Sequence, residues 1–296
     1  MIISNVIGGL GNQMFQYACG RALSLDCDQE LRLFLGDFSG YKLHSGFTLS
    51  SVFTGDFPIA DANTLRALIG WRSSQMARRA LRHPALAGLR GKRFVVDHEH
   101  TIESDLAASL PPQGAFLFGY WQSERYFERH AAQLRRDLSW RQALEGRNAI
   151  IAELMREGRS VSIHVRRGDY ASNPAVLAKH GVCAIEYYLR AVKALTDDGR
   201  ARSWYLFSDD VAWVRKHLAP HLDGEVHVVD HNRSDDSHFD MQLMSLCDDH
   251  IIANSSFSWW GAWLSSSSDQ RVIAPERWFA NFVETANRCP PSWLRL

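Results

Sequence analysis

The chain has 296 residues, of which 46% are hydrophobic and 11% aromatic, which is ample for packed cores and favours two domains. Its 33 lysines and arginines balance 33 aspartates and glutamates, so no overall basic excess points to a nucleic-acid partner. Five scattered cysteines without a CxxC pair argue against a zinc site or a disulfide framework, and no stretch reaches the ~18 consecutive apolar residues of a membrane span, so we expect a cytoplasmic protein.

The amino-terminal residues predict a strand at Ile2–Ile7, a glycine-rich turn at Gly8–Gln13, a helix at Met14–Leu25 and a second strand at Glu30–Leu35. Alternating strands and helices indicate a parallel sheet with helices on both faces. No charged leader or cleavage site precedes the first strand, so we expect the chain to be complete.

The middle of the chain is less regular, and a domain boundary is expected at the glycine and arginine of positions 158–159. Residues 66–93 contain eight cationic side chains and no acidic one. They form either a solvated arginine-rich helix face or a peripheral contact with the anionic inner face of a membrane. The predicted elements are helix at 61–93, strands at 94–96 and 115–120, and helices at 122–138 and 142–157.

The second half restarts the alternation of strands and helices. The predicted fold class is therefore α/β, with two facing Rossmann-like domains at 1–158 and 159–296. Ligands in such sheets bind beyond the carboxyl ends of the strands. The predicted strands are 161–165, 204–207, 226–229, 251–253 and 272–274, and the helices are 185–195, 211–218, 239–247 and 259–264.

Two arginines follow the strand at 161–165, where ligands bind. His164 and Arg166 share one face of the strand, and Arg167 comes next. The planar, permanently charged arginine fork suits a phosphate, and the nearby Asp169 can hold it in place. The alternative is a structural ion pair beside a core histidine.

The glycine turn is ambiguous by itself. Met14 replaces the third glycine of a dinucleotide-binding turn, and the lysine of a P-loop is missing. The turn still places backbone N–H groups at a helix N-terminus, which favours an anion. Structural punctuation and ligand binding both remain open.

Paired aspartates follow the strand at 204–207. Asp209 and Asp210 could bind a metal or a sugar hydroxyl, or cap the helix that starts at Val211. The DxD pattern at residues 26–28 lies at a probable turn, and we assign it no metal.

A further candidate segment follows the strand at 251–253. Asn254, Ser255 and Ser256 supply polar groups there, and Ser258 is expected to cap the next helix. The tryptophans at 259, 260 and 263 are expected to pack that helix rather than bind sugar.

Together these segments resemble glycosyltransferase family 11, the bacterial and animal α-1,2-fucosyltransferases. The matching pieces occur in the family's order and span most of the chain, whereas residues 61–110 present no motif that aligns. They are GGLGNQMFQYA (8–18), GYWQSERYF (119–127), SIHVRRGDY (162–170), FSDD (207–210) and NSSFSWWGAWL (254–264).

The resemblance implies a GT-B fold with a cleft between the domains, GDP-fucose as donor, inversion at the anomeric carbon, and no metal or cofactor. The expected product is an α-1,2-linked fucose on the 2-hydroxyl of a terminal β-galactoside. The first domain is assigned to the acceptor and the second to GDP-fucose. A bacterial cytoplasmic setting favours a lipid-linked oligosaccharide as acceptor.

The resemblance, together with the positions of polar residues after predicted strands, gives expected roles to individual residues. Arg166, Asn12 and Asp169 are the expected catalytic residues. The expected acceptor-binding residues are Asp37, Trp121 and Gln122. The expected donor-binding residues are His164, Arg166, Arg167, Gly9, Gly11, Asn12, Ser208, Asp209, Asp210, Asn254, Ser255, Ser256 and Phe257.

Several alternatives stay open. Asp169 and Asp37 are both candidates for the general base, and Asp209, Asp210 and Asp240 for reading the guanine. The competing functions are another GDP-sugar-dependent glycosyltransferase, a non-catalytic nucleotide-sugar-binding module, and a nicotinamide oxidoreductase. The sequence does not indicate an oligomeric state.

Overall fold

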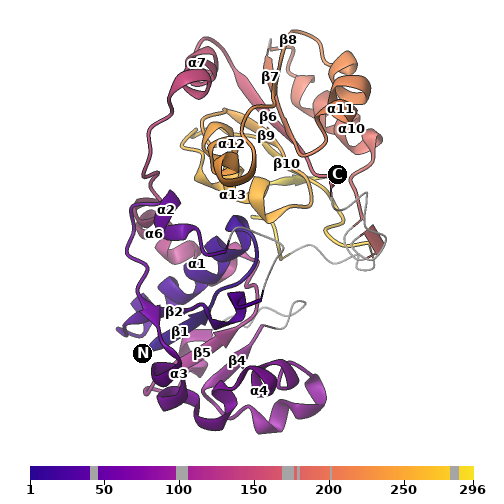
Figure 1. The fold of residues 1–296 in the computed structure, drawn as a ribbon. Coiled ribbons are helices and arrows are strands. Elements are labelled where there is room, and N and C mark those ends of the chain that lie inside the picture. The colour runs from indigo at the N-terminus through magenta and orange to yellow at the C-terminus, as the bar shows by residue number, and fades with distance from the viewer. Residues whose placement is uncertain (41–45, 98–105, 169–176, 179–180, 201, 281–286) are drawn as a thin grey trace. The chain divides into compact units, whose positions relative to one another are not determined.

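The computed structural model describes residues 1–40, 46–97, 106–168, 177–178, 181–200, 202–280 and 287–296. They fall into two compact units, Met1–Arg141 and Gln142–Leu296, each built on a parallel sheet with helices on both faces (Figure 1). The predicted α/β class is confirmed. The division lies earlier in the chain than the glycine and arginine at 158–159 indicated.

The sheet of the first unit has the strand order β3-β2-β1-β5-β4, and all its pairs are parallel. The central strand β1 is buried along its whole length, as expected for a strand covered on both faces. The strands are β1 (Ile2–Asn5), β2 (Leu31–Phe34), β3 (Ile59–Ala60), β4 (Phe94–Val96) and β5 (Ala115–Phe118).

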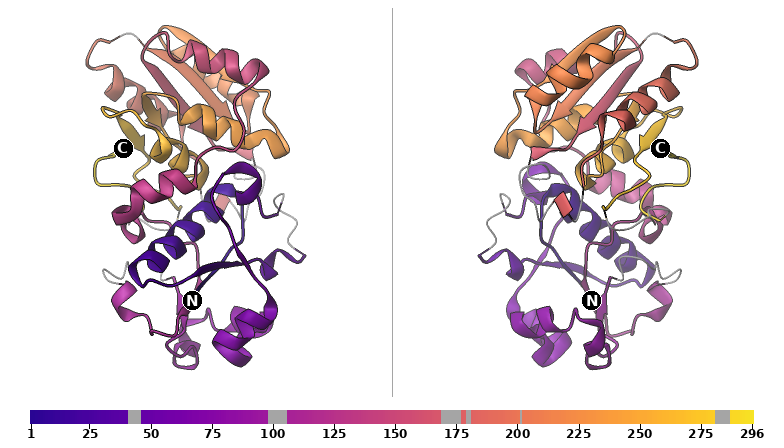
Figure 2. Two further views of the ribbon diagram at one scale, coloured as in Figure 1. Left: turned by 90° about the vertical axis from the view of Figure 1, so that its left-hand side faces the viewer. Right: turned by 90° about the vertical axis from the view of Figure 1, so that its right-hand side faces the viewer.

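Helix α1 (Leu10–Asp26) covers one face of this sheet, and α3 (Ala62–Ile69) and α4 (Gln75–Ala80) lie on the other (Figures 1 and 2). Helix α1 packs closely because Gly20 has no side chain; a Cβ there would come within 2.8 Å of Leu31. The opposite face is filled by an aromatic cluster formed by Phe34, Phe94, Phe116 and Phe118.

The predicted helix at 61–93 is broken into pieces. Helix α3 ends at Gly70, whose φ of +61° a helix cannot continue. A 3₁₀ turn η2 (Gly70–Ser73) follows, Ser74 caps α4, and η3 (Pro84–Leu89) begins at a proline. The predicted helix at 122–138 is similarly divided into η4 (Glu124–Tyr126), η5 (Glu128–His130) and α6 (Ala131–Asp137).

Three short helical elements of the first unit have no strong pattern in the sequence and were not expected from it. They are η1 (Gly36–Phe38), α2 (Leu49–Val52) and α5 (Leu106–Ser109). Each spans a single turn, too short for hydrophobic periodicity to show.

The sheet of the second unit has the strand order β11-β10-β9-β6-β7-β8, again parallel. Residues 160–165 of β6 pair in register with 203–208 of β7, so both strands end at the same level. The strands are β6 (Ser160–Val165), β7 (Ser203–Ser208), β8 (Glu225–Val229), β9 (Asp249–Ile251), β10 (Val272–Ala274) and β11 (Leu294–Arg295).

Helices cover both faces of this second sheet (Figures 1 and 2). Val161, Ile163 and Val165 of β6 pack in one core with the buried side chains of α10 and η6. On that face lie α10 (Ile185–Thr196), α11 (Val211–Trp213), the π-helical turn η6 (Val214–Leu218) and η7 (Ala219–His221). The other face carries η8 (Ser234–Ser237), α12 (His238–Met244) and α13 (Ser256–Leu264).

The tryptophans of α13 confirm the packing prediction. Trp259, Trp260 and Trp263 are all buried, and the ring of Trp259 also contacts that of Trp293 at 5.3 Å. They build the core between the helix and its neighbours.

Helix α7 (Gly146–Leu154) explains the shifted boundary, because it packs on α12 of the second unit. Its Asn148 exchanges side-chain hydrogen bonds with Asn232 at 2.9 Å and contacts His231 at 2.8 Å. All five cysteines are free thiols. Within the described ranges, no helix is long and apolar enough to cross a membrane.

A buried ion pair anchors the second sheet. The carboxylate of Asp249 is fully buried and accepts two hydrogen bonds from Arg159, both at 2.8 Å. Arg159 also binds Asp269, whose side chain is 66% exposed. The same arginine thus has one buried and one exposed partner.

We predict that Asp249→Ala lowers the free energy of unfolding by about 3–5 kcal/mol, because it removes the buried partner of Arg159 and leaves that guanidinium only its water-exposed partner Asp269. Asp269→Ala, the matched control, should cost below about 1 kcal/mol, because its ion pair is exposed to water. Urea unfolding monitored by circular dichroism measures both values. Equal losses would contradict the assignment.

Candidate active site

Among the described residues, the carboxylate of Asp209 binds the loop after β6 at two points. Nη1 of Arg166 lies 2.9 Å from Oδ2 of Asp209, and the backbone N–H of Arg167 donates to Oδ1 of the same residue at 2.8 Å. Asp209 follows β7, the neighbour of β6. Asp209 is therefore a partner of Arg166. Asp169, which the sequence indicated for this role, lies outside the described ranges, so its part stays a prediction.

Gly168 allows this carboxylate to approach. A Cβ at position 168 would lie 2.8 Å from Oδ2 of Asp209, closer than real contacts permit. The glycine of the arginine motif is therefore a requirement of the Asp209 clamp.

Arg167 is fixed on a different surface. Its guanidinium lies 4.3 Å from the centre of the Trp213 ring, and Nε is 3.4 Å from Oδ2 of Asp210. Asp210 also caps α11, because its Oδ1 accepts the backbone N–H of Trp213 at 3.1 Å. The capping prediction is thus confirmed for Asp210. Ser208, a predicted donor-binding residue, donates to the carbonyl of Val165 at 2.8 Å and ties the two strand ends together.

His164 is a buried, neutral imidazole beside these arginines. Burial lowers its pKa to about 4; the charge of Asp209 opposes that shift, and Arg166 adds to it. Its ring centre is 5.9 Å from that of Phe257. Within the described residues its Nδ1 has no hydrogen-bond partner, which leaves a polar atom for a ligand.

The N-terminus of α13 completes this group in the second unit. Ser255 caps the helix by accepting the backbone N–H of Phe257 at 3.3 Å, and the helix begins at Ser256. The prediction that Ser258 is the cap is wrong, because Ser258 is buried inside the first turn. Asn254 uses its amide within the protein, donating to the carbonyl of Trp278 at 3.2 Å.

The glycine turn of the first unit ends at Gly9, which is the N-cap of α1. Gly8 has a φ of +96°, which glycine adopts without strain. Oδ1 of Asn12 accepts a hydrogen bond from Nε2 of Gln122 at 2.7 Å. Two residues that the sequence placed in different roles, catalytic and acceptor-binding, therefore contact each other. Gly11 is buried in the first turn of α1.

Two buried glutamines shape this turn, and sequence reasoning missed them. Gln13 donates to the carbonyls of Gly8 and Gly46, both at 2.8 Å. Gln16 accepts from the backbone N–H of Ile7 at 3.0 Å and donates to the carbonyl of Gly119 at 2.9 Å. The signal was available in the sequence, since two glutamines three residues apart on a buried helix need backbone partners.

Asp97 plays a similar part beside Trp121. Its Oδ2 accepts the backbone N–H groups of Tyr120 and Trp121 at 3.2 and 2.8 Å. Trp121 has a φ of +55° and a buried side chain that packs edge-on against Tyr126. Its ring is part of the core, and its predicted contact with an acceptor is untested.

Two other aspartates that the sequence analysis considered form ion pairs. Oδ1 of Asp37 lies 2.5 Å from Nη2 of Arg78, and both side chains are largely buried. Asp26, from the DxD pattern, binds Arg129 and His130 at 2.8 and 2.7 Å. Among the described residues no cluster of three or more His, Cys, Asp or Glu side chains could hold a metal.

Asp240 belongs to a polar cluster at the end of β8. It accepts from Nδ2 of Asn232 at 2.7 Å, and Asn232 in turn contacts Asn148. Desolvation raises the pKa of Asp240 to about 7, and the Asn232 hydrogen bond only partly offsets this. A carboxyl that is half protonated at neutral pH can donate as well as accept.

Comparison with known proteins identifies the family to which the chain belongs. Residues 97–296 match the model of the family described as "Glycosyl transferase family 11". Over its whole length the chain is 34% identical to an alpha-1,2-colitosyltransferase of Escherichia coli, of which it covers 99%. The chain belongs to glycosyl transferase family 11. Another relative of this family 11 member is the O-antigen biosynthesis glycosyltransferase WbnK of Escherichia coli, 29% identical over 98% of each chain.

The fold of the family 11 chain is similar to that of solved fucosyltransferases. The crystal structure of fucosyltransferase NodZ from Bradyrhizobium superposes with a TM-score of 0.56 and 15% identity, over 88% of this chain and 91% of that one. The likeness confirms the predicted GT-B type of fold. The family establishes that the chain is a glycosyltransferase, which excludes the oxidoreductase alternative.

We predict that Gly168→Ala lowers kcat roughly 10–100-fold with little change in stability, because the new Cβ displaces the Asp209 carboxylate and so misplaces Arg166. The matched control is Gly158→Ala, whose Cβ would meet nothing within 4 Å. Turnover and thermal unfolding of both variants are the measurements. Unchanged turnover in Gly168→Ala would contradict the role of the clamp.

We predict a second effect from the Asp240 carboxyl. Because its pKa is raised in the folded state, it contributes relative stability at low pH that is lost as the pH rises from about 4 through about 7. Asp240→Asn should therefore gain stability over wild type between pH 5 and pH 8. Urea midpoints at both pH values measure this, with the exposed neighbour variant Asp236→Asn as control. Parallel pH curves for wild type and Asp240→Asn would refute the prediction.

Proposed function

We propose that the chain is an inverting fucosyltransferase that transfers L-fucose from GDP-β-L-fucose to the 2-hydroxyl of a terminal β-galactoside, without a metal. One observation carries this proposal: Arg166 is clamped by Asp209 beside the neutral His164 and the N-terminus of α13, in a family 11 chain. Together with the second arginine, Arg167, the neutral His164 imidazole and the helix N-terminus suit a diphosphate.

The reaction is an in-line displacement. The acceptor oxygen forms a bond to the anomeric carbon as the bond from that carbon to the phosphate oxygen breaks, and GDP leaves with both electrons of that bond. Negative charge grows on the leaving phosphate, and a preorganised guanidinium stabilises it without reorganising. Arg166, 30% exposed and held by Asp209, is the residue we assign to this charge.

Two carboxylates are candidates to accept the proton of the acceptor hydroxyl. Asp37, one candidate base, is held by Arg78 in the first unit, and Asp169, the other, is proposed to orient the arginines or accept the proton. An oxocarbenium-like transition state needs little base assistance, so the acceptor oxygen can lose its proton late. Asn12 and Gln122 form the polar pair that we propose to lie near the acceptor.

A second candidate donor deserves a test because a 34% identical relative is named an alpha-1,2-colitosyltransferase. Colitose is L-fucose without its 3-hydroxyl group. A site that hydrogen-bonds this hydroxyl would reject the deoxy sugar by about 10⁴-fold, whereas an apolar pocket would discriminate only weakly. The donor pocket therefore decides between the two sugars.

The deciding experiment measures GDP release from GDP-fucose and from GDP-colitose, with lactose as acceptor, in EDTA and in Mg²⁺, and reads the product linkage by NMR. Acceptor-dependent release from GDP-fucose in EDTA with an α-1,2 product is the expected result. Preference for GDP-colitose would replace the donor and keep the reaction class. GDP binding without turnover on any galactoside would favour the non-catalytic alternative.

We predict that Arg166→Ala lowers kcat by about 10²–10⁴, the scale of a lost transition-state donor. Arg166→Lys should recover little, because an ammonium group cannot reproduce the fork that Asp209 holds. The exposed Arg156→Ala serves as control, and GDP release under donor saturation is the assay. Near-normal turnover in Arg166→Ala would overturn the assignment.

A further inference from the structure

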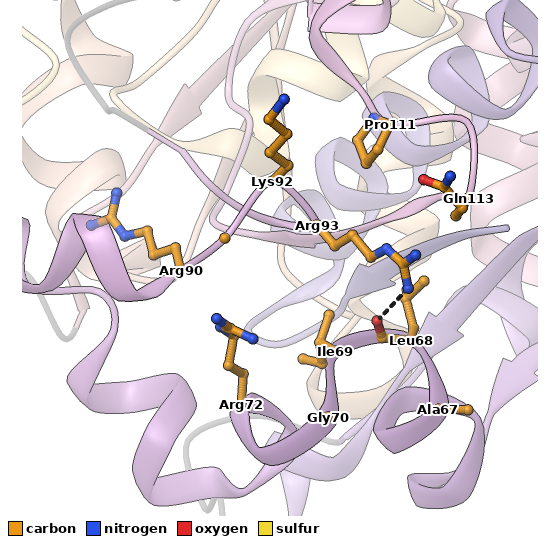
Figure 3. Close-up of a pocket in the computed structure, with 11 residues that line it drawn as sticks. Ala67, Leu68, Ile69, Gly70, Arg72, Arg90, Lys92, Arg93, Pro111 and Gln113 are labelled. Atoms are coloured by element: carbon orange, nitrogen blue, oxygen red, sulfur yellow. Dashed lines mark hydrogen bonds between the residues drawn. The ribbon is translucent and has the colours of Figure 1, made fainter.

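A basic pocket lies on the first unit, and none of the residues that line it was assigned above to the candidate active site. Its volume is about 530 Å³, and four cationic side chains line it together with the end of α3, Pro111 and Gln113 (Figure 3). The cations are Arg72, Arg90, Lys92 and Arg93, and none of the lining residues is acidic. A pocket of this charge selects an anion.

Backbone carbonyls hold the arginines of this pocket in place. Nε of Arg72 donates to the carbonyl of Leu89 at 2.6 Å, and Nη1 of Arg93 donates to the carbonyl of Leu68 at 3.3 Å, the bond drawn in Figure 3. Arg90 is buried and donates to the carbonyl of Leu81 at 2.8 Å. Because these side chains are already ordered, an anion binding there costs little additional conformational entropy.

The eight cations of residues 66–93 divide into three groups by their exposure to solvent. Arg78 and Arg90 are buried and serve the fold, whereas Arg66, Arg79, Arg82 and Lys92 are exposed, with Arg72 and Arg93 in between. The segment has no acidic residue, so its surface field is positive while the rest of the chain is correspondingly acidic. This asymmetry orients the unit towards a negatively charged surface.

Large apolar side chains are exposed among these cations. Trp71 is 59% exposed, Leu89 is 51% exposed, and Met76, at the start of α4, is 85% exposed. The Arg72 guanidinium lies 5.0 Å from the centre of the Trp71 ring and also binds the carbonyl of Leu89. Arg72 therefore links the anion pocket to two exposed apolar side chains.

We propose that this face of the first unit docks on an anionic phospholipid bilayer. Lipid phosphates would bind at the pocket and the exposed cations, and Trp71, Leu89 and Met76 would enter the interfacial layer. A soluble anion would account for the pocket but not for the exposed side chains of Trp71 and Leu89, both residues that the pocket's Arg72 contacts. Tryptophan next to arginine is the combination that membrane interfaces favour. The proposal does not depend on which sugar the enzyme transfers.

The test is flotation of the full-length protein with vesicles of phosphatidylcholine alone and of phosphatidylcholine with 30% phosphatidylglycerol. We expect binding to the anionic vesicles only, weakening as salt screens the charges. Each neutralised cation should weaken binding about fivefold, so Arg79→Gln/Lys92→Gln should lose about 25-fold. Trp71→Ser should also weaken binding to the anionic vesicles. Because its contribution is apolar, the loss relative to wild type should be the same at low and at high salt.

Matched controls come from the second unit. Arg156→Gln/Lys216→Gln removes two exposed cations and the same net charge, and Ile150→Ser removes an apolar side chain that is 60% exposed. Both controls should bind like wild type. Equal loss in the controls, or no binding of wild type to anionic vesicles, would overturn the proposal. Binding of inorganic phosphate that depends on these residues, without any vesicle binding, would also overturn the proposal, because it would indicate a site for a soluble anion.

Turnover on a soluble acceptor, measured for every variant, separates this proposal from the catalytic one. The docking variants should retain it, because none of their residues belongs to the candidate active site. Vesicle binding without any sugar transfer would leave the docking proposal standing and count against the proposed function alone.

Discussion

The carboxylate of Asp209 is the contact on which the candidate site depends. It joins the ends of two neighbouring parallel strands, because it binds the side chain of Arg166 and the backbone of Arg167 together. Parallel register brings the two strand ends to one level, and Gly168 leaves the space that the carboxylate fills. Arginine position is thereby set by the sheet and not by the flexibility of a long side chain.

The first unit uses two glutamine amides and one carboxylate for the same purpose. Gln13 and Gln16 hold the glycine turn through backbone carbonyls and N–H groups, and Asp97 holds the turn after β5. Asn12 and Gln122 are presented at the ends of two neighbouring strands by these contacts. In both units, polar residues beyond strand ends are positioned by partners that bind backbone atoms.

Much of this could be predicted from the sequence. The alternation of apolar strands and amphipathic helices fixed the α/β class, and the strands at 161–165 and 272–274 were placed within a residue. The long helix expected at 61–93 failed because Gly70 and Pro84 act on backbone geometry, which charge and periodicity do not reveal. The boundary expected at residues 158–159 differs from the division after Arg141, because helix α7 packs on α12 of the second unit and sequence patterns do not reveal such tertiary contacts.

The candidate site, like the fold, was predicted from the sequence only in part. Motif spacing found the arginines, the aspartates and the serines, since each follows a strand. It could not tell that Asp209 pairs with Arg166, because that contact depends on strand order, and β6 and β7 are neighbours in space with a long crossover between them. Nor could spacing tell that Ser255 rather than Ser258 begins the helix, since both are competent caps.

The depressed pKa of His164 has a consequence for how the enzyme's rate should be read against proton concentration. With a neutral imidazole and guanidinium groups that never lose their protons, the proposed phosphate-binding side of the site keeps one charge state across the physiological range before the donor binds. In the proposed reaction, a pH dependence of kcat/KM in this range, which reports the free enzyme and the free substrates, then points to groups other than these.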